Sequence, residues 1–177
     1  MEITTNSAVH CRHRGFTMLE LMTALSIAAV LVAVGAPALT DMTQNQRIKA
    51  AADDLQIDLA LARSEAVTRA TNVTVCTTSD NATCTNDGWA NGRIVFVDSN
   101  ANGTIDAGDT DIRHAVAVGY GLTSSASVAS GFVTFNARGQ VLTPNVIGIC
   151  KSGLYGRTIA IKSTGHPSVN KTAAVCS

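Results

Sequence analysis

Residues 12–39 read RHRGFTMLELMTALSIAAVLVAVGAPAL, a short basic segment followed by a long apolar one. The apolar part, residues 16–39, contains 24 residues. A signal-peptide core has roughly 7–15 residues, and a helix that spans a bilayer needs roughly 20. Arg12 and Arg14 precede the apolar part, so the positive-inside rule places the N-terminus in the cytoplasm. The segment is therefore predicted to be a retained membrane anchor and not a cleaved secretory signal.

Glu20 is the only charged residue of this apolar segment. A carboxylate costs roughly 2.5 kcal/mol or more at the bilayer centre and less toward the interface, so its presence indicates a function. Gly15 followed by FTMLE at residues 16–20 resembles the cleavage and assembly motif of type IV prepilins and type II secretion pseudopilins. The resemblance implies that prepilin peptidase, a membrane-embedded aspartyl protease, cuts between Gly15 and Phe16 and methylates Phe16.

The same resemblance implies an assembly role for Glu20. In the mature chain its carboxylate would pair with the N-terminal ammonium of a neighbouring subunit in a filament. Each of these charges is unfavourable in an apolar environment, and the pairing compensates both. Only a neighbour in the correct register offers the partner, so the pair would also select the register of assembly.

From residue 40 the chain is predicted to continue as an amphipathic helix to about Ala70, with a kink at Pro37. One face carries apolar residues at alternating steps of four and three: Ile48, Ala52, Leu55, Leu59, Ala62 and Ala66. Charged residues are expected on the other faces: Arg47, Asp53, Asp54, Asp58 and Arg63. The apolar face is short and rich in alanine, which favours packing within the chain over a coiled coil.

Residues 71–177 contain short β-branched runs separated by Gly, Asn, Asp and Ser, a pattern typical of antiparallel β structure. Strands are predicted at residues 73–76, 93–97, 112–118, 132–135, 146–150, 157–161 and 173–176, and a polar loop at 123–130. The predicted fold class is α+β, a long N-terminal helix packed on a small antiparallel β head. Its regions are a cleaved leader (1–15), a transmembrane helix (16–39), an amphipathic helix (40–70) and the head (71–177).

Four cysteines lie in the part predicted to be exported, where oxidising conditions favour disulfides: Cys76, Cys84, Cys150 and Cys176. Cys11 lies in the leader. Four cysteines allow three pairings, of which proximity in the sequence favours Cys76 with Cys84 and Cys150 with Cys176. A zinc site is less favoured, because the chain has no Cys-x-x-Cys pair and no nearby histidine cluster.

Gly88-Trp89, then RIVFVD at residues 93–98 and an Asn/Gly/Asp-rich turn, resembles the FimT/GspH group of minor pilins and pseudopilins. The resemblance implies a pilin-like fold and a role in priming or capping filament assembly. It implies a single-pass protein of the bacterial inner membrane with its head in the periplasm, whose N-terminal helix contacts other pilins or pseudopilins. The expected function is that of a FimT-like minor type IV pilin, with a GspH-like minor pseudopilin of a type II secretion system as the alternative.

Residues 98–109 meet the spacing of an EF-hand loop, with oxygen-bearing side chains at alternate positions and glycine at the turn. The candidate calcium ligands are Asp98, Asn100, Asn102, Asp106 and Asp109. The last ligand is Asp instead of the longer Glu, and the flanking segments are predicted strands instead of helices. A polar turn, in which Asn and Gly adopt left-handed backbone conformations, is therefore favoured over calcium binding.

Charge is unevenly distributed, although 13 basic residues balance 13 acidic ones overall. Residues 71–121 contain six Asp and two Arg, whereas residues 122–177 contain five basic residues and no acidic residue. A basic region without acids suits a phosphate backbone, and some FimT proteins bind DNA during natural transformation. The candidate DNA-binding residues are Lys151, Arg157, Lys162, His166 and Lys171. The same region would equally suit an acidic neighbour in a filament.

DNA-binding FimT proteins carry a Gly-Arg-x-Arg motif, and the corresponding segment here reads Gly165-His166-Pro167-Ser168. Both arginines are absent, and an unperturbed histidine is largely neutral at pH 7. Gly156-Arg157 begins in the same way but continues into a predicted strand. DNA binding is therefore a hypothesis that the charge pattern favours and the missing motif weakens.

An enzyme is not expected. The histidines after the leader, His114 and His166, lie in no recognisable nucleophile motif, and the chain has no phosphate-binding loop and no Gly-x-Ser-x-Gly elbow. His114 falls in a predicted strand and is interpreted as structural. Apart from calcium at residues 98–109, the sequence indicates no cofactor.

Overall fold

The computed structural model describes residues 15–117, 119, 121–151 and 156–170. Its contacts divide the chain into two compact units, Met1–Thr40 and Asp41–Ser177. One helix, α1 (Met18–Arg69), begins in the first unit and ends in the second. Eight strands follow in the second unit: β1 (Val73–Thr78), β2 (Gly92–Val97), β3 (Thr110–Ala115), β4 (Thr123–Ala126), β5 (Phe132–Phe135), β6 (Asn145–Cys150), β7 (Arg157–Ile161) and β8 (Pro167–Asn170).

The described part of the first unit is helical from Met18, and its large apolar side chains are all exposed. Helix α1 is apolar and long enough to cross a membrane, and the most apolar window is not buried within the protein. Hydroxyl groups in this unit donate to carbonyl oxygens one turn earlier: Thr23 to Glu20, Ser26 to Met22 and Thr40 to Ala36. These bonds satisfy the hydroxyl groups inside the helix, as an apolar surrounding requires.

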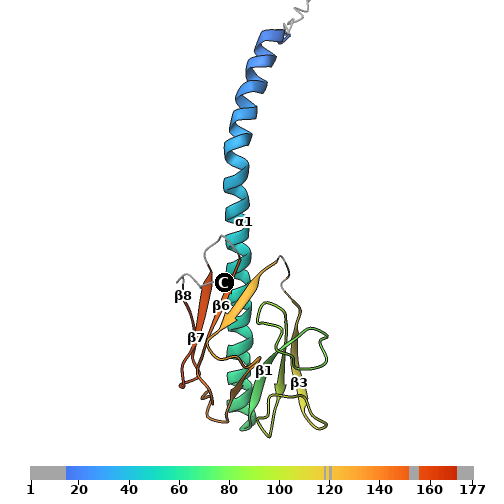
Figure 1. Cartoon of the computed structure of the whole chain (residues 1–177), viewed down its shortest axis with the longest axis vertical. Coiled ribbons are helices and arrows are strands. Elements are labelled where there is room, and N and C mark those ends of the chain that lie inside the picture. Colours follow the sequence, from blue (N-terminus) through green and yellow to red (C-terminus); the bar gives the residue numbers. More distant parts are fainter. Residues whose placement is uncertain (1–14, 118, 120, 152–155, 171–177) are drawn as a thin grey trace, which may run out of the picture. The chain divides into compact units, whose positions relative to one another are not determined.

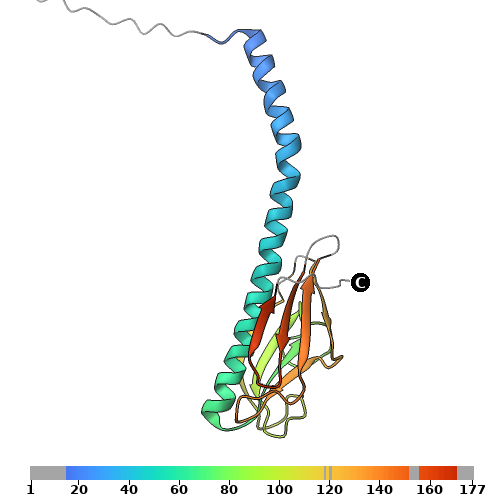
Figure 2. The same cartoon turned by 90° about the vertical axis from the view of Figure 1, so that its left-hand side faces the viewer.

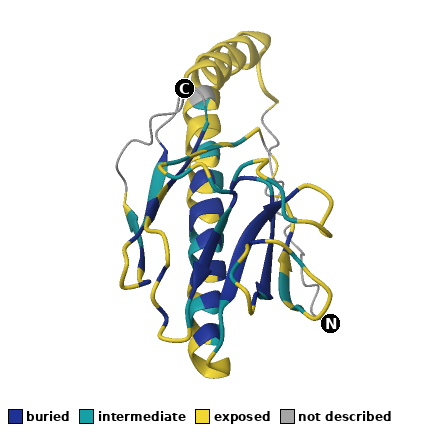
Figure 3. Cartoon of the chain, turned by 60° about the horizontal axis from the view of Figure 1, so that its bottom comes forward, coloured by how far each residue is buried: buried dark blue, intermediate teal, exposed yellow. Residues whose placement is uncertain are grey.

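In the second unit, the apolar face of α1 packs on the sheets, as the spacing of its apolar residues predicted. Ile48, Ala52, Leu55, Leu59, Ala62 and Ala66 are 0–1% exposed, and all but Ile48 belong to one core with residues of both sheets. Figure 3 shows this buried face of the helix turned toward the strands. The helix ends one residue before the predicted position, where Ala70 adopts a φ of 51° and the Thr71 N–H donates to Ala66 O over 3.2 Å.

The strands form two four-stranded antiparallel sheets. Sheet A has the order β3-β2-β1-β5, and sheet B has the order β4-β6-β7-β8. Figure 1 shows β3 and β8 on opposite sides of the head. Figure 2 shows that both sheets lie on one side of the outer half of α1. The long helix and the antiparallel sheets confirm the predicted α+β fold class.

Sheet A is covered on both faces, which explains why all six residues of β1 are buried. Val73 and Val75 face the core under α1, whereas Cys76 belongs to a second cluster with Ile94 and Phe96 on the other face. Cys84, Ile105 and Phe132 pack against this second cluster. The threonines of β1 can be buried because their hydroxyl groups find partners, as Thr74 does with Asp98 and Thr134.

Several strand predictions need correction. Residues 123–130, predicted as a polar loop, contain β4, and β8 was not predicted. The predicted strand 112–118 begins earlier, and β3 ends at Ala115, while residue 118 and the predicted strand 173–176 lie outside the described residues. Both missed strands are edge strands made of small or polar residues. They are strands because they hydrogen-bond to their neighbours, and their sequences show no hydrophobic alternation that would predict them.

Candidate assembly site and head surfaces

The predicted processing and assembly residues lie at the start of α1. Gly15 and Phe16 precede the helix and are exposed, and Phe16 is 79% exposed. Thr17 caps the helix, because its Oγ1 accepts the N–H of Glu20 over 3.3 Å. The carboxyl group of Glu20 lies in the first turn, close to the positive end of the helix dipole. It accepts no hydrogen bond from the described residues, so an approaching cation would meet an accessible carboxylate.

A disulfide closes the loop after β1. Cys76 and Cys84 are bonded with an S–S distance of 2.07 Å, which confirms this predicted pair. Inside the loop, the carboxyl group of Asp80 accepts hydrogen bonds from Ala82 N–H, Thr83 N–H and two hydroxyl groups. These bonds hold the pKa of Asp80 well below its usual range. Cys150 is also disulfide-bonded, whereas Cys176, its predicted partner, lies outside the described residues.

The proposed calcium loop, residues 98–109, uses its side-chain oxygens to hold itself together. Asp98 is buried and accepts bonds from Thr74 Oγ1 (2.7 Å) and from the N–H of Gly103 (3.0 Å). The amide nitrogens of Asn100 and Asn102 donate to Asp106, and these bonds lower the pKa of Asp106. In the described part of the chain, no three Asp, Glu, His or Cys side chains gather where they would hold a metal ion. These hydrogen bonds fit the polar turn that the sequence analysis favoured at residues 98–109.

Gly103 is required in this loop for packing. It adopts a φ of 76°, and a Cβ atom there would lie 2.6 Å from the ring of Phe132. Gly103→Ala is expected to destabilise the head by roughly 1–3 kcal/mol through overpacking, in addition to backbone strain. Urea unfolding of the full chain in detergent micelles, followed by the fluorescence of the single tryptophan, measures this change.

Gly108→Ala provides the matched control for this prediction. Gly108 also has a positive φ, 113°, but a Cβ atom there meets nothing within 4 Å. The control variant therefore carries the backbone strain without the clash. Equal destabilisation by the two substitutions would show that contact with Phe132 does not explain the glycine.

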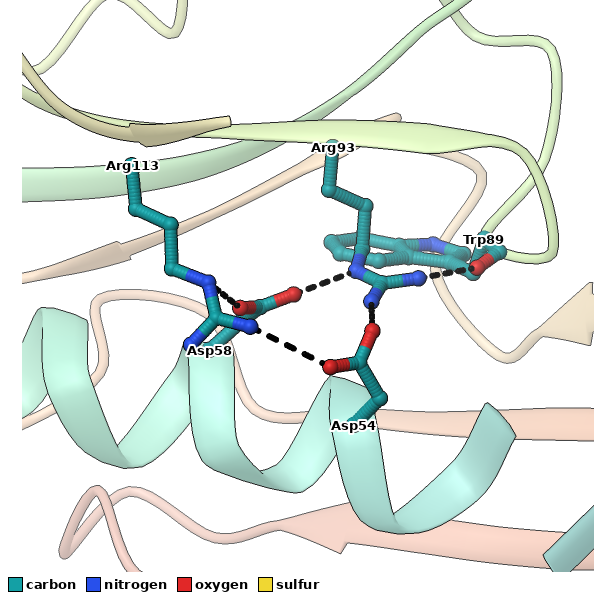
Figure 4. Close-up of polar contacts among 5 residues, drawn as sticks. All are labelled: Asp54, Asp58, Trp89, Arg93 and Arg113. Carbon is teal, nitrogen blue, oxygen red and sulfur yellow. Dashed lines mark hydrogen bonds and ion pairs between the residues drawn. The ribbon is translucent and has the colours of Figure 1, made fainter. Parts of the chain in front are cut away.

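A buried ion-pair cluster joins α1 to β2 and β3 (Figure 4). The side chains of Arg93 and Asp58 are fully buried, and Nε of Arg93 lies 2.7 Å from Oδ2 of Asp58. Arg93 also donates to a carboxylate oxygen of Asp54 and to the carbonyl oxygen of Trp89. Arg113 completes the cluster, with Nη2 3.2 Å from Oδ1 of Asp54 and Nε 3.1 Å from Oδ1 of Asp58.

Two guanidinium groups balance two carboxylates in this cluster, so the formal charges cancel. Burial raises the pKa of Asp58 above its ordinary 3.8, although Arg93 and Arg113 act in the opposite direction. Removal of one partner would leave a buried charge without compensation, which is far more unfavourable than the intact pair. The cluster therefore fixes the outer half of α1 against sheet A.

The prediction that Asp58 lies off the apolar face of the helix was wrong, because Asp58 is buried beside that face. Asp58 is 0% exposed and adjoins Leu59 of the apolar face. The pattern of apolar residues carries no information on a buried ion pair, because it treats every charged residue as exposed. One signal was present, since Asp54 and Asp58 are four residues apart and share a helix face that offers two carboxylates to a common partner.

Residues 51–165, more than half of the chain, match the family model for the type II transport protein GspH. The chain belongs to the GspH family. Residues 11–36 match the prokaryotic N-terminal methylation motif, so the beginning of this GspH-family chain is that of the type IV pilin superfamily. No curated protein sequence gives a significant match.

Two solved structures of the type IV minor pilin FimU from Pseudomonas aeruginosa are similar to this GspH-family chain. One is 25% identical, with 73% of this chain and 92% of FimU covered at a TM-score of 0.59. The other is 27% identical, with 69% and 91% covered at a TM-score of 0.55. The minor pseudopilin EpsH of Vibrio cholerae is 15% identical, with 70% and 96% covered at a TM-score of 0.51, and shares the fold. The chain is therefore a member of the minor pilin and pseudopilin group.

The candidate DNA-binding residues of the GspH-family chain do not form one group. Arg157 begins β7 and Lys162 follows its last residue, so five residue steps, or about 16 Å of strand, separate them. Lys151 follows β6 beside Arg157, since Ile149 pairs with Arg157. Lys171 lies outside the described residues.

Lys162 and His166 instead share one end of the head with Arg138. The turn at residues 136–140 contacts the turn between β7 and β8, because Val141 N–H donates to Ser163 O over 3.2 Å. Arg63 of α1 donates from Nε to Gly139 O over 3.1 Å. Side chains of Arg138, Lys162 and His166 are exposed there. The tertiary structure thus adds Arg138 and Arg63 to this end and separates Arg157 from it.

Proposed function

We propose that this protein is a minor pilin that enters a type IV pilus through its N-terminal helix. Two observations support the proposal. The N-terminal methylation motif covers residues 11–36, and the head resembles FimU, a type IV minor pilin, at 25–27% identity over most of FimU. The similarity to the pseudopilin EpsH is one of fold at lower identity, which favours the pilus over a secretion pseudopilus.

In this proposal, prepilin peptidase cuts after Gly15 while α1 lies in the inner membrane with the head in the periplasm. The new ammonium group of Phe16 then lies just before α1 and the carboxylate of Glu20 in its first turn, among exposed apolar side chains. Large apolar side chains of α1 between residues 18 and 39 are 54–81% exposed, including Leu19, Met22 and Leu31, and neighbouring helices would bury them in the filament. The Glu20 carboxylate pairs with the ammonium group of the next subunit.

The test is the location of the chain in cells of its host. Antibodies against the head would be used on pili sheared from the cell surface, with strains lacking the pilus machinery and strains lacking the type II secretion machinery as comparisons. The proposal expects the chain in sheared pili, and its loss only when the pilus machinery is removed. Dependence on the secretion machinery instead would establish the pseudopilin alternative.

DNA binding is a second candidate function, favoured by the exposed basic residues at the end of sheet B. Fluorescence anisotropy with labelled duplex DNA across a salt series is expected to show binding that weakens with salt. Arg138→Gln combined with Lys162→Gln removes two phosphate contacts and is expected to lower the salt slope by about two. Lys49→Gln, an exposed lysine of α1, is the control. No binding at low salt would leave filament assembly as the function.

A further inference from the structure

The basic residues of sheet B and its loops lie at two opposite ends of the head. Arg138 and Lys162 share one end with Arg63 of α1, because the turn that contains Arg138 contacts both the helix and the turn after β7. Arg157 begins β7 and Lys151 follows β6 beside it, so this pair lies at the opposite end of the two strands. The pair Lys151 and Arg157 therefore has surroundings of its own.

Contacts along α1 show which end of the head holds this pair. Arg63 lies near the turn between β7 and β8, and Gln56 Nε2 donates to the carbonyl oxygen of Pro167, the first residue of β8, over 3.5 Å. β8 therefore runs back along α1 toward lower residue numbers, and its last residue, Asn170, pairs with Thr158 of β7. Figure 2 shows β7 and β8 beside the outer half of α1.

Lys151 and Arg157 consequently lie at the end where α1 enters the head. Three residue steps of β8, about 10 Å of strand, correspond to about seven residues of α1. Counted back from Gln56, they reach Lys49, which is exposed. We call this end of the head the entry end, and the end near Arg63 the far end.

The entry end is close enough to the apolar segment for lipid headgroups to act on it. Lys49 follows Leu39, the last residue of that segment, by ten residues, or about 15 Å of helix. The headgroup layer on each side of a bilayer is about 5–8 Å thick, and charges act over a Debye length of about 8 Å at physiological ionic strength. The far end is about 20 Å further along α1 and lies beyond this range.

Sheet A carries the opposite charge at the entry end. α1 ends at Arg69 and β1 begins at Val73, so β1 runs back from the far end, and the loop after it lies at the entry end. That loop contains exposed Asp80 and Asp87 and no basic residue. Residues 41–53 of α1 contain two basic and two acidic residues and add no net charge. The entry end thus has an acidic corner at sheet A and a basic corner at sheet B.

The basic corner, Lys151 and Arg157, has no acidic residue of its own segment to compensate it. The sequence contains no Asp or Glu after Asp111, and both side chains are half-buried, so their positions on the head are restrained while part of each stays accessible. An anionic surface below the entry end would attract this corner and repel the corner with Asp80 and Asp87. The charge pattern therefore fits a lipid surface and specifies how the head would lie on it.

We propose that, before assembly, the head rests on the anionic phospholipid surface of the membrane that holds α1, with its basic corner on the headgroups and its acidic corner turned away. The inference rests on the membrane-anchored stage of the proposed function and adds an orientation of the head. Each basic residue near an anionic surface favours the contact about fivefold. Two such residues orient the head through a weak contact that filament entry can displace.

Lysine acetylation of the full chain in lipid nanodiscs tests this contact. Nanodiscs of neutral phosphatidylcholine would be compared with nanodiscs that also contain anionic phosphatidylglycerol, with an uncharged reagent and mass spectrometry of each lysine. Lys151 is expected to react several-fold more slowly in the anionic nanodiscs. Lys162, at the far end of the same sheet, should react equally in both. The slowing of Lys151 should disappear toward 1 M salt, where the Debye length is about 3 Å.

Arg157→Gln separates attraction from mere closeness to the membrane. Loss of one of the two charges weakens the contact about fivefold, so most of the slowing of Lys151 should be lost. Arg138→Gln removes an exposed charge at the far end and is the matched control, which should keep the slowing. Near-UV circular dichroism establishes that both variant heads are folded.

The acidic corner gives a readout of orientation in the wild-type chain. Carbodiimide labelling of Asp87 with a neutral amine should proceed at equal rates in the two kinds of nanodisc, because this corner faces away from the lipid. Slowing of Asp87 to the same extent as Lys151 would overturn the proposed orientation. Equal Lys151 rates in both nanodiscs, equal slowing of Lys162, or undiminished slowing in Arg157→Gln would overturn the contact.

The sheared-pilus assay keeps the proposed function separate from this inference. Slowing of Lys151 by anionic lipid, in a chain that is absent from pili, would refute the proposed function and leave the contact with lipid. Presence in pili together with equal Lys151 rates in the two kinds of nanodisc would refute only the contact.

Discussion

Glu20→Ala is expected to insert into the membrane as the wild type does and to be almost absent from assembled filaments. The substitution makes the helix more apolar, so insertion is not impaired. It removes the carboxylate that would compensate the ammonium group of a neighbour. A pair of unit charges 4 Å apart is worth on the order of 4 kcal/mol at an effective dielectric constant of 20. A loss of this size lowers incorporation by more than roughly a hundredfold.

Quantitative immunoblotting of membrane and sheared-filament fractions measures this effect. Ser26→Ala is the matched control, because Ser26 is exposed on the same helix and its hydroxyl group bonds only within the helix among the described residues. Incorporation of the Ser26 variant should be unchanged. Wild-type incorporation of Glu20→Ala would refute the charge pairing, whatever the membrane fraction shows.

Asp58→Ala is expected to destabilise the head by about 3–5 kcal/mol, a large part of the stability of a small domain. Arg93 is 0% exposed, and its Nε would lose its carboxylate partner in a site that water does not reach. Urea unfolding of the full chain in detergent micelles gives the free energy of unfolding. Trp89 reports the site directly, because it is the single tryptophan, is 2% exposed and its carbonyl oxygen accepts a bond from Arg93.

Two further variants make this result interpretable. Asp53→Ala removes a half-buried carboxylate one position outside the cluster and should change stability by about 0.5 kcal/mol or less. Arg93→Met in the Asp58→Leu background removes both buried charges and should recover much of the loss. A double variant less stable than Asp58→Ala would show that the cluster stabilises through its shape and not through charge compensation.

Periodicity predicted the parts of the fold that depend on local pattern. The apolar face of α1 was identified from its spacing and is buried in the core. The strands at residues 73–76 and 132–135 lie within β1 and β5, because β-branched and aromatic residues have a clear preference for buried sheet. The edge strands β4 and β8 were not predicted, because their small polar residues form strands only through hydrogen bonds to β6 and β7.

Spacing along the chain predicted the nearby disulfide between Cys76 and Cys84, which are eight residues apart. For residues 98–109 the sequence favoured a polar turn over a calcium loop, and the structure shows the hydrogen bonds of that turn. A calcium motif specifies only which residue types stand at which positions. Whether their oxygen atoms point toward a common centre or accept hydrogen bonds from the loop itself depends on the tertiary structure. Asp98 accepts a hydrogen bond from the loop, and Gly103 leaves space for the ring of Phe132, which is distant in the sequence.

The sequence alone predicted a membrane anchor and determined the N-terminal methylation motif with Glu20 and the α+β class, because each follows from composition or from contacts between near neighbours in the chain. Only the tertiary structure paired Arg93 with Asp58, 35 residues away, and moved Arg138 beside Lys162 while separating Arg157 from them. The physical reason is that charges act through space. The packing of α1 on the two sheets decides which charged groups are neighbours, and a local sequence pattern does not specify the distances between such groups.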